Sequence, residues 1–377
     1  MNKLTQYNSE HPRFQAAVDL LRRLIAVPSP SGKEDDTAAI WQQWLEEHGV
    51  GEVCRVRNNV FVVAPGFDSS KPILMLNSHH DTVRPSTAYT RDPYSPDIAD
   101  GRIYGLGSND AGASGVALAA TFLDLASDDT LPVNLLFAIS ASEENMSPEG
   151  MRLLLPELTS RGLKPDMAIV GEPTGMQPAV AERGLLVLDG VATGRQGHAA
   201  RDEGINAIYR AIEDIGLLQS FSTPVVSSVL GPIKVSITMI EAGTQHNVVP
   251  ATCSYVVDVR TTDAYTNQET VELLRQTVRW SSLTPRSTHI GASALPLGHP
   301  LFKAALALGL EPFVSPTTSD MALLHGIPSL KIGPGQSSRS HAADEYVCLD
   351  EINEALYVYP QIIKNLANGK TTLEQGF

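Results

Sequence analysis

The chain of 377 residues carries a formal net charge of -14, with 42% hydrophobic and 19% charged residues, a composition typical of globular proteins. The acidic balance argues against a nucleic-acid or anionic-membrane partner, because both bind basic surfaces. The three cysteines are widely spaced, so we expect no disulfide framework. No apolar run approaches 18 residues, so we expect no membrane span. The N-terminal stretch has no apolar core, so we expect no secretory signal and a cytoplasmic protein.

The first half of the chain alternates helical and strand patterns. Apolar residues at helical spacing predict helices at residues 13–26, 33–49, 111–126 and 151–158. Short apolar runs bounded by turn residues predict strands at 52–57, 60–64, 73–77, 133–140 and 166–170. This alternation favours an α/β fold with a doubly wound, mostly parallel sheet and helices on both faces.

The pattern changes in the second half. It predicts a strand, a helix, two strands, a helix and a strand at 185–192, 204–218, 234–241, 251–260, 268–280 and 287–292. This order is typical of a ferredoxin-like α+β module. Helix and strand then alternate again, at 301–308, 312–314, 320–325, 329–332 and 351–366. We therefore expect a discontinuous catalytic domain at residues 1–182 and 291–377, with an inserted domain at 183–290.

Polar side chains follow several of the predicted strands of the large sheet. In open α/β sheets, ligands bind beyond the carboxyl ends of the strands. Five separate segments therefore deliver histidine or carboxylate side chains towards one edge: His79, Asp110, Glu143 with Glu144, Glu172, and His341.

Imidazoles and carboxylates together suit zinc, or cobalt in its place. A carboxylate can bridge two such ions, and one member of the Glu143-Glu144 pair can ligate while the other accepts a proton. Asp81, two residues after His79 on an extended segment, can hold the imidazole. Taken singly, each of these residues could equally be a loop or helix-cap residue. Gly105 and Gly107 lack the further glycine of a dinucleotide-binding motif.

Read together, these motifs resemble the aminoacylase/acetylornithine deacetylase/succinyl-diaminopimelate desuccinylase family of di-zinc metallohydrolases, and the match covers nearly the whole chain. The segments that carry the resemblance are His79-His80-Asp81, Gly105 to Asp110, Glu143-Glu144, Gly171-Glu172-Pro173, and Ser340-His341. Within the family, Thr90 to Tyr94, Gly101 to Gly107 and Gly171 to Thr174 resemble the acetylornithine deacetylase branch. The chain departs from the family pattern at two places. After Asp110 it has Ala111-Gly112-Ala113 where Met-Lys-Gly is usual, and after Glu144 it has Asn145 where glycine is usual.

The resemblance implies two divalent metal ions, Zn²⁺ with Co²⁺ as a substitute. It implies that His79, Asp110 and Glu172 bind one ion, and that Asp110, Glu144 and His341 bind the other. Glu143 is then the general base and Asp81 the orienting residue. The inserted module resembles the family's lid and dimerisation domain, which implies a homodimer. Residues that the resemblance places near the substrate are His198, Asn247, Arg260, Gly333 and Gly335.

The activity that the resemblance implies is hydrolysis of an N-acyl amino acid, with N-acetyl-L-ornithine as the first expected substrate, in arginine biosynthesis. The alternatives are N-acetylcitrulline, N-succinylornithine or N-succinylcitrulline, followed by desuccinylation of succinyl-diaminopimelate or a dipeptidase activity. A metal-binding or peptide-binding relative without turnover is the alternative outside enzymes. A succinyl tail needs an extra cation, for which Arg84 and Arg91 are available.

Overall fold

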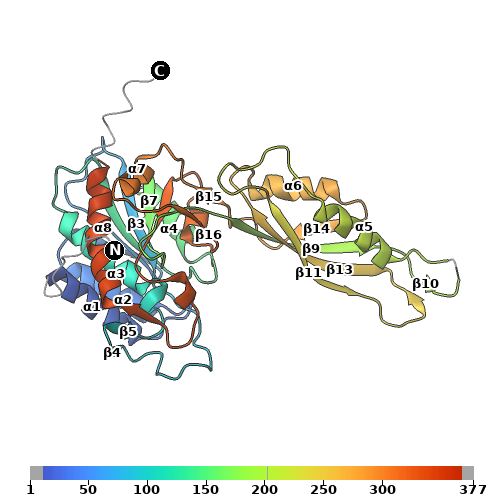
Figure 1. Cartoon of the computed structure of the whole chain (residues 1–377), viewed down its shortest axis with the longest axis horizontal. Coiled ribbons are helices and arrows are strands. Elements are labelled where there is room, and N and C mark those ends of the chain that lie inside the picture. The colour runs from blue at the N-terminus through green and yellow to red at the C-terminus, as the bar shows by residue number, and fades with distance from the viewer. Residues whose placement is uncertain (1–11, 202, 367–377) are drawn as a thin grey trace, which may run out of the picture. The chain divides into compact units, whose positions relative to one another are not determined.

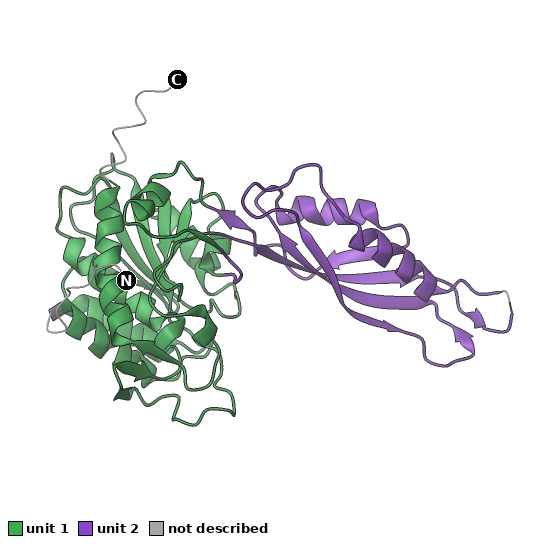
Figure 2. Cartoon of the chain, in the orientation of Figure 1, with its two compact units in different colours: residues 1–180, 295–313, 319–377 green, residues 181–294, 314–318 purple. Residues whose placement is uncertain are grey.

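The computed structural model describes residues 12–201 and 203–366. The N-terminal stretch for which no secretory signal is expected lies mostly outside those residues. Of the described residues, 12–180, 295–313 and 319–366 form one compact unit, unit 1, and the others form unit 2 (Figure 2). Unit 2 holds residues 181–294, close to the expected insertion, and also 314–318, a short segment that the sequence pattern places in the large domain.

The large sheet has the strand order β1-β2-β6-β3-β7-β17-β8-β15, with β16 paired to β8. Its central strands β6, β3, β7 and β17 are parallel, and the strands on either side of them are antiparallel. The prediction of a mostly parallel central sheet is therefore confirmed. The strands are β1 Val53–Val56, β2 Asn59–Val63, β3 Ile73–His79, β6 Asn134–Ser140, β7 Met167–Val170, β8 Ala179–Glu182, β15 Ser293–Ala294, β16 Phe313–Ser315 and β17 Ser329–Lys331.

Helices cover both faces of this sheet (Figure 1). Because side chains alternate along a strand, Leu74 and Leu76 of β3 enter one apolar core, with α1, α2, α3 and α8. Ile73 and Met75 enter the other core, with α4. The helices of unit 1 are α1 Pro12–Ile25, α2 Asp35–Glu47, η1 Ser108–Gly112, α3 Ala113–Leu125, α4 Met151–Ser160, α7 Pro300–Leu306, η2 Asp320–Leu323, η3 Ser337–Arg339 and α8 Leu349–Asn365.

The small-residue helix α3 follows the segment that carries Asp110 and packs closely on the large sheet. A Cβ atom at Gly115 would lie 3.1 Å from a methyl group of Ile139 and 3.3 Å from the Trp41 ring. Glycine at this position therefore lets the helix approach both neighbours. A small sheet of order β18-β5-β4 joins the chain before Asp110 to the chain after His341. Its strands are β4 Ile98–Ala99, β5 Arg102–Tyr104 and β18 Tyr346–Cys348.

Unit 2 contains an antiparallel sheet of order β11-β13-β9-β14. With two helices between its strands, this is the predicted ferredoxin-like arrangement. The prediction of a last strand at 287–292 is wrong: β14 lies earlier, and Leu283 is its buried apolar residue. The elements are β9 Gly184–Thr193, β10 Gly197–His198, α5 Ala207–Gln219, β11 Lys234–Ala242, β12 Val248–Val249, β13 Thr252–Thr261, α6 Asn267–Thr277 and β14 Ser281–Pro285.

Both helices of unit 2 begin at a side-chain cap. Asn206 accepts a hydrogen bond from the backbone N–H of Ile208 at the start of α5. Thr266 and Glu269 form a reciprocal capping box at the start of α6, which satisfies backbone donors that a helix leaves unpaired. Among the described residues, no helix is long and apolar enough to cross a membrane.

Candidate metal centre

Three neighbouring parallel strands end at one edge of the large sheet, and predicted site residues follow each of them. His79 is the last residue of β3 and is in register with Ser140, the last residue of β6. Glu143 and Glu144 follow β6, and Glu172 follows β7 by two residues. The carboxyl ends of parallel strands lie together, so short loops are sufficient to bring these side chains to one place.

Asp110 lies between the two predicted histidine ligands. Its Oδ1 is 3.2 Å from Nε2 of His79, and its Oδ2 is 3.7 Å from Nε2 of His341. Nε2 of His341 also lies 2.9 Å from Oε2 of Glu144, and Nε2 of His79 lies 3.8 Å from Oε1 of Glu172. The structure thus brings the five predicted ligands together, with one Asp110 oxygen towards each imidazole.

The site gathers acidic side chains away from water. Burial raises the pKa of Glu144 and that of Glu172 to about 8, and the Asp110 carboxylate contributes to both shifts. Burial also raises the pKa of Glu143 well above its ordinary value. For His79, burial alone would lower the pKa, but hydrogen bonding to Asp110 raises it well above the usual range. Such a group has the oxygen and imidazole donors that a divalent cation prefers, and a bound cation would favour the ionised form of these carboxyl groups.

Asp81 holds the imidazole and the glutamate loop at the same time. Nδ1 of His79 lies 3.0 Å from the backbone carbonyl oxygen of Asp81 and 3.4 Å from its carboxylate. This leaves Nε2 directed at Asp110. The Asp81 carboxylate also accepts hydrogen bonds from the backbone N–H groups of Glu143 and Glu144, at 2.9 and 3.2 Å. One buried carboxylate therefore connects the ends of β3 and β6.

His80 points away from the cluster, as its place beside His79 predicts. Its Nδ1 lies 2.9 Å from Oγ1 of Thr37, and its Nε2 lies 2.8 Å from the carbonyl oxygen of Asn58. Both ring nitrogens are thus engaged with the N-terminal part of the chain. The side chain connects β3 to that region rather than serving as a ligand.

Glu345 has a role that the sequence interpretation missed. Its carboxylate, only 2% exposed, accepts hydrogen bonds from the backbone N–H groups of Gly107, Asn109 and Asp110, at 2.8 to 3.1 Å. These bonds fix the loop that presents Asp110. In the sequence, only its position four residues after His341 indicates that Glu345 lies near the site. Its partners are backbone N–H groups, which a sequence pattern does not identify.

Asp320 is a second buried acid without a predicted role. Its Oδ2 accepts a hydrogen bond from the hydroxyl of Ser140, at the end of β6. The same hydroxyl lies 2.9 Å from the carbonyl oxygen of Ser78 and accepts a hydrogen bond from the side-chain Nδ2 of Asn77 at 3.2 Å. Burial raises the pKa of Asp320 to about 6. This network lies against the last residues of β3, behind His79.

The two predicted glycines lie against the ligand-bearing loops. A Cβ atom at Gly333 would lie 2.5 Å from the carbonyl oxygen of Glu172 and 2.3 Å from Oγ of Ser114. Gly335, with φ +87°, leaves no room for a Cβ atom beside Oδ1 of Asn109. Both glycines therefore allow close approach of the 333–335 loop to the chain around the cluster.

The remaining predicted residues lie in unit 2. His198 and Asn247 are neighbours, because β10 pairs with β12 and the Asn247 carbonyl oxygen accepts a hydrogen bond from Ala199. Nδ1 of His198 accepts a hydrogen bond from the backbone of Ala200, and the side chain is exposed. Arg260 lies on β13, with its guanidinium group 2.9 Å from Asp258.

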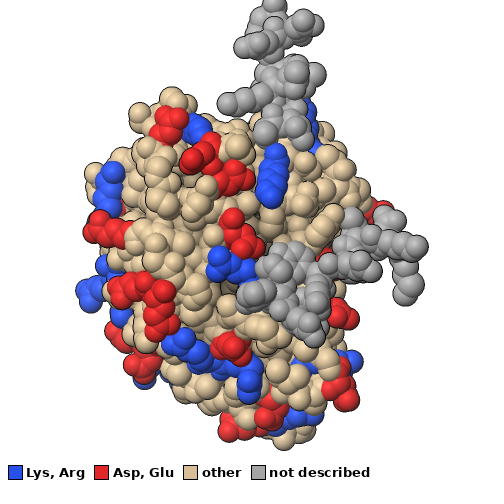
Figure 3. Space-filling model, turned by 90° about the vertical axis from the view of Figure 1, so that its left-hand side faces the viewer, with Lys and Arg blue, Asp and Glu red and all other residues tan. Residues whose placement is uncertain are grey.

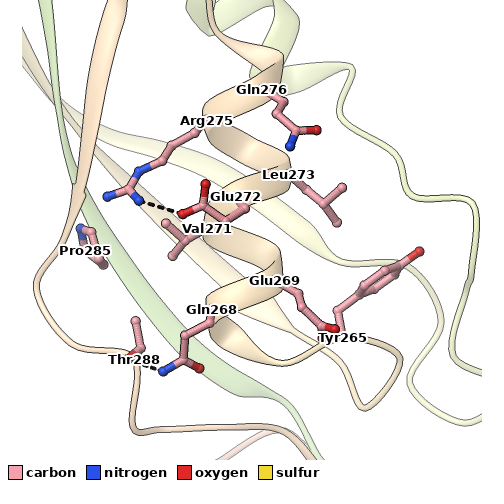
Figure 4. Close-up of a pocket in the computed structure, with 10 residues that line it drawn as sticks. All are labelled: Tyr265, Gln268, Glu269, Val271, Glu272, Leu273, Arg275, Gln276, Pro285 and Thr288. Atoms are coloured by element: carbon pink, nitrogen blue, oxygen red, sulfur yellow. Dashed lines mark hydrogen bonds and ion pairs between the residues drawn. The ribbon is translucent and has the colours of Figure 1, made fainter.

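Unit 2 also has a groove along α6, with a volume of about 500 Å³. Its wall includes Tyr265, Leu273 and Pro285, and Glu272 pairs with Arg275 within it (Figure 4). None of the predicted site residues lines this groove. On the face shown in Figure 3, acidic and basic side chains are interspersed.

Solved structures with this fold cover almost the whole chain. Aminopeptidase PepT from Bacillus cereus has a TM-score of 0.73 and 18% sequence identity, over 94% of this chain and 99% of its own. The YXEP protein of Bacillus subtilis, described as a dinuclear metal binding peptidase from the M20 family, has a TM-score of 0.70 and 17% identity, over 95% and 99% of the two chains. At these identities the likeness establishes the fold.

Curated relatives match over nearly their full lengths. Succinyl-diaminopimelate desuccinylase 2 of Ruegeria sp. (strain TM1040) is 28% identical, over 97% of this chain and 98% of the relative. Acetylornithine deacetylase of Proteus mirabilis (strain HI4320) is 26% identical, over 95% and 98%. Residues 75–365 match the family described as Peptidase family M20/M25/M40. The chain therefore belongs to peptidase family M20/M25/M40 and is a hydrolase that acts on amide bonds.

Proposed function

We propose that this enzyme removes a short acyl group from the nitrogen of an amino acid, with N-acetyl-L-ornithine as the first-choice substrate. The observation that carries the proposal is Asp110, which directs one oxygen to each of two imidazoles, with the buried Glu143 alongside them. In this proposal the enzyme acts in the cytoplasm, in arginine biosynthesis. The N-succinyl compounds and N-acetylcitrulline are its alternative substrates.

Two divalent metal ions, Zn²⁺ in the first place, fit the donors of the cluster. His79, Asp110 and Glu172 would hold one ion, and Asp110, Glu144 and His341 the other. When bound, such ions acidify water and polarise a carbonyl group. Co²⁺ has similar ligand preferences and is expected to substitute.

Glu143 is the proposed general base. It lies next in sequence to the proposed ligand Glu144, and the Asp81 carboxylate accepts a hydrogen bond from the backbone N–H of each of the two glutamates. In the proposed reaction its carboxylate takes a proton from the water that attacks the acyl carbonyl carbon. It then delivers that proton to the amine nitrogen as the C–N bond breaks. Asp81 keeps the His79 ring in its orientation throughout.

Unit 2 is proposed to act as the lid and to contribute His198, whose exposed imidazole would hydrogen-bond the oxyanion of the tetrahedral intermediate. Asn247 and Arg260 are the further proposed contacts to substrate, and the 333–335 loop would receive the substrate carboxylate. These roles rest on the family resemblance and on the exposure of His198.

The direct test is a panel of N-acyl amino acids incubated with the Zn²⁺ or Co²⁺ enzyme and scored for release of the free amine. We expect the highest kcat/KM for N-acetyl-L-ornithine. If no acetyl or succinyl derivative of ornithine or citrulline is turned over, the proposed substrate class is wrong. A chain that binds metal but hydrolyses no amide in the panel would instead support the non-catalytic alternative.

A desuccinylase activity is the second candidate, because the Ruegeria relative bears that name. Arg91 is the proposed cation for the extra carboxylate, and its guanidinium group lies 4.0 Å from the centre of the Tyr104 ring. Backbone N–H groups of Thr90 and Arg91 bind Asp344, three residues after His341. The segment that carries this arginine is thus attached to the loop that carries a ligand.

Replacement of Arg91 by alanine separates the two candidates. If a succinyl tail reaches this side chain, kcat/KM for N-succinyl substrates falls by about fivefold, the scale of an exposed ion pair. The kcat/KM for N-acetyl substrates should stay unchanged, because an acetyl group carries no charge that could pair with Arg91. Arg161→Ala is the control, because it removes an exposed arginine at the end of α4 that pairs with Glu157 and that has no proposed role in the site. Equal effects on both substrate series would contradict a role for Arg91 in acyl selection.

We also propose a homodimer formed through unit 2. The strand β11 is at the edge of its sheet. Its residues Met239 and Ile240 are 66% and 56% exposed. Tyr209 and Ile212, one turn apart on α5, are exposed by 71% and 57%. An unpaired strand edge beside apolar side chains is suited to pairing with a second copy of the chain.

We therefore expect the wild type to sediment as a dimer. The Ile240→Glu variant should sediment as a monomer, because a dimer would bury the new charge at the strand edge. Val226→Glu introduces the same charge at another exposed apolar position of unit 2 and should leave the dimer intact. A monomeric wild type would contradict the proposal.

A further inference from the structure

Ser142, the residue before the proposed base, has a backbone conformation that needs support. Its φ is +55°, in the left-handed region that residues with a Cβ atom rarely adopt. Ser142 is also almost fully buried, so water does not stabilise this conformation. Because Ser142 starts the turn that carries Glu143, its conformation sets the direction in which the base points.

Glu34 supplies that support from a distant part of the chain. Its Oε1 accepts hydrogen bonds from both the backbone N–H and the hydroxyl of Ser142, at 3.2 and 2.8 Å. It also accepts one from the N–H of Gly32 at 2.6 Å, while Oε2 accepts one from the Asn58 side chain at 3.0 Å. The side chain of Glu34 is buried, and the residue is 1% exposed. Four donors thus satisfy a carboxylate that lies away from water.

The loop that carries Glu34 is itself attached to the site on both sides. The hydroxyl of Thr37 donates to the Glu34 carbonyl oxygen and lies within hydrogen-bonding distance of His80. Ser31 donates to the Asp81 carboxylate at 2.7 Å. Asp81 and Glu34 together bind three successive backbone N–H groups, those of residues 142, 143 and 144. The turn after β6 is therefore held by two carboxylates that come from different segments.

We propose that Glu34 is a positioning residue, which holds Ser142 in its left-handed conformation and thereby aims the Glu143 carboxylate. This inference rests on the proposed function in one respect, the assignment of Glu143 as the base. Glu34 contacts none of the five proposed ligands among the hydrogen bonds of the described residues, so its loss should affect proton transfer more than metal binding.

The test uses Glu34→Ala alone and combined with substitutions at Ser142, all in the metal-loaded enzyme and with whichever substrate the wild type hydrolyses best. Glu34→Ala should lower kcat by about 10- to 100-fold, the scale of lost outer-shell contacts. KM and metal content should stay within threefold of the wild type. Glu34→Gln provides a second, milder variant if the alanine variant does not fold.

Rescue distinguishes a positioning role from a general loss of structure. Glycine adopts positive φ at little cost, so Ser142→Gly in the Glu34→Ala background should raise kcat at least fivefold. Ser142→Ala removes the same hydroxyl but keeps the Cβ atom, and should give no rescue. Equal kcat values for the two double variants, or a wild-type kcat for Glu34→Ala, would overturn the inference. A fully active Glu143→Gln would instead overturn the proposed base, so the two failures are distinguishable.

Discussion

Glu143→Gln is expected to lower kcat by about 10³-fold while the enzyme keeps its full metal content. The amide has nearly the shape of the carboxylate but cannot accept the proton of the attacking water, and general base catalysis contributes on this scale. The proposed ligands are unchanged, and the Glu143 backbone N–H can still bind Asp81. Steady-state kinetics and metal analysis on the same preparation measure both quantities.

Glu149→Gln is the matched control for this substitution. Glu149 lies in the same connection after β6 but is exposed and pairs with Arg57 at 3.5 Å. Its replacement should leave kcat within twofold of the wild type. Full activity in Glu143→Gln with both metals bound would show that another group takes the proton.

His341→Ala should remove metal before it affects the fold. The imidazole is 54% exposed, and alanine keeps the Cβ atom that histidine already carries at this left-handed position (φ +59°), so loss of the ring should change the free energy of unfolding of the metal-free protein by less than about 1 kcal/mol. The proposed second ion would lose one of three protein ligands, and the enzyme should retain at most one metal equivalent after dialysis. Activity should fall at least 100-fold.

Metal analysis and thermal unfolding in the presence of a chelator separate these effects. The control is His48→Ala, an exposed histidine at the end of α2 whose Nδ1 lies 2.7 Å from the carbonyl oxygen of Trp44. It should retain both metal equivalents. A metal-free His341→Ala protein that melts well below the metal-free wild type would point to a structural role for the loop instead.

Much of the large sheet could be predicted because its central strands are buried on both faces. The runs at residues 73–76 and 135–139 are apolar throughout, and such runs are typical of strands that are buried on both faces. β8 was missed because Ala179–Glu182 is short and follows a turn-rich stretch. β14 was placed too late because Leu283 is its only fully buried residue, so the strand shows little apolar pattern.

The candidate ligands were accessible from the sequence for a different reason. Each follows a strand or a loop whose direction the parallel topology dictates, so proximity could be inferred without knowing any distance. Glu34 and Glu345 were missed because they act on backbone N–H groups, which are the same in every residue except proline. Their partners, Ser142 and Asp110, lie more than 100 residues away along the chain. Only the folded structure could reveal such pairs.

The convergence of the Asp110, Glu144 and Glu172 carboxyl groups has a consequence for the lifetime of the protein in a cell. A ligand that binds only the folded state stabilises it by an amount that grows with the logarithm of the free ligand concentration. Newly made chains in a metal-poor cell would therefore unfold more often and meet proteases more often. The amount of this enzyme should thus follow metal supply even when its synthesis is constant.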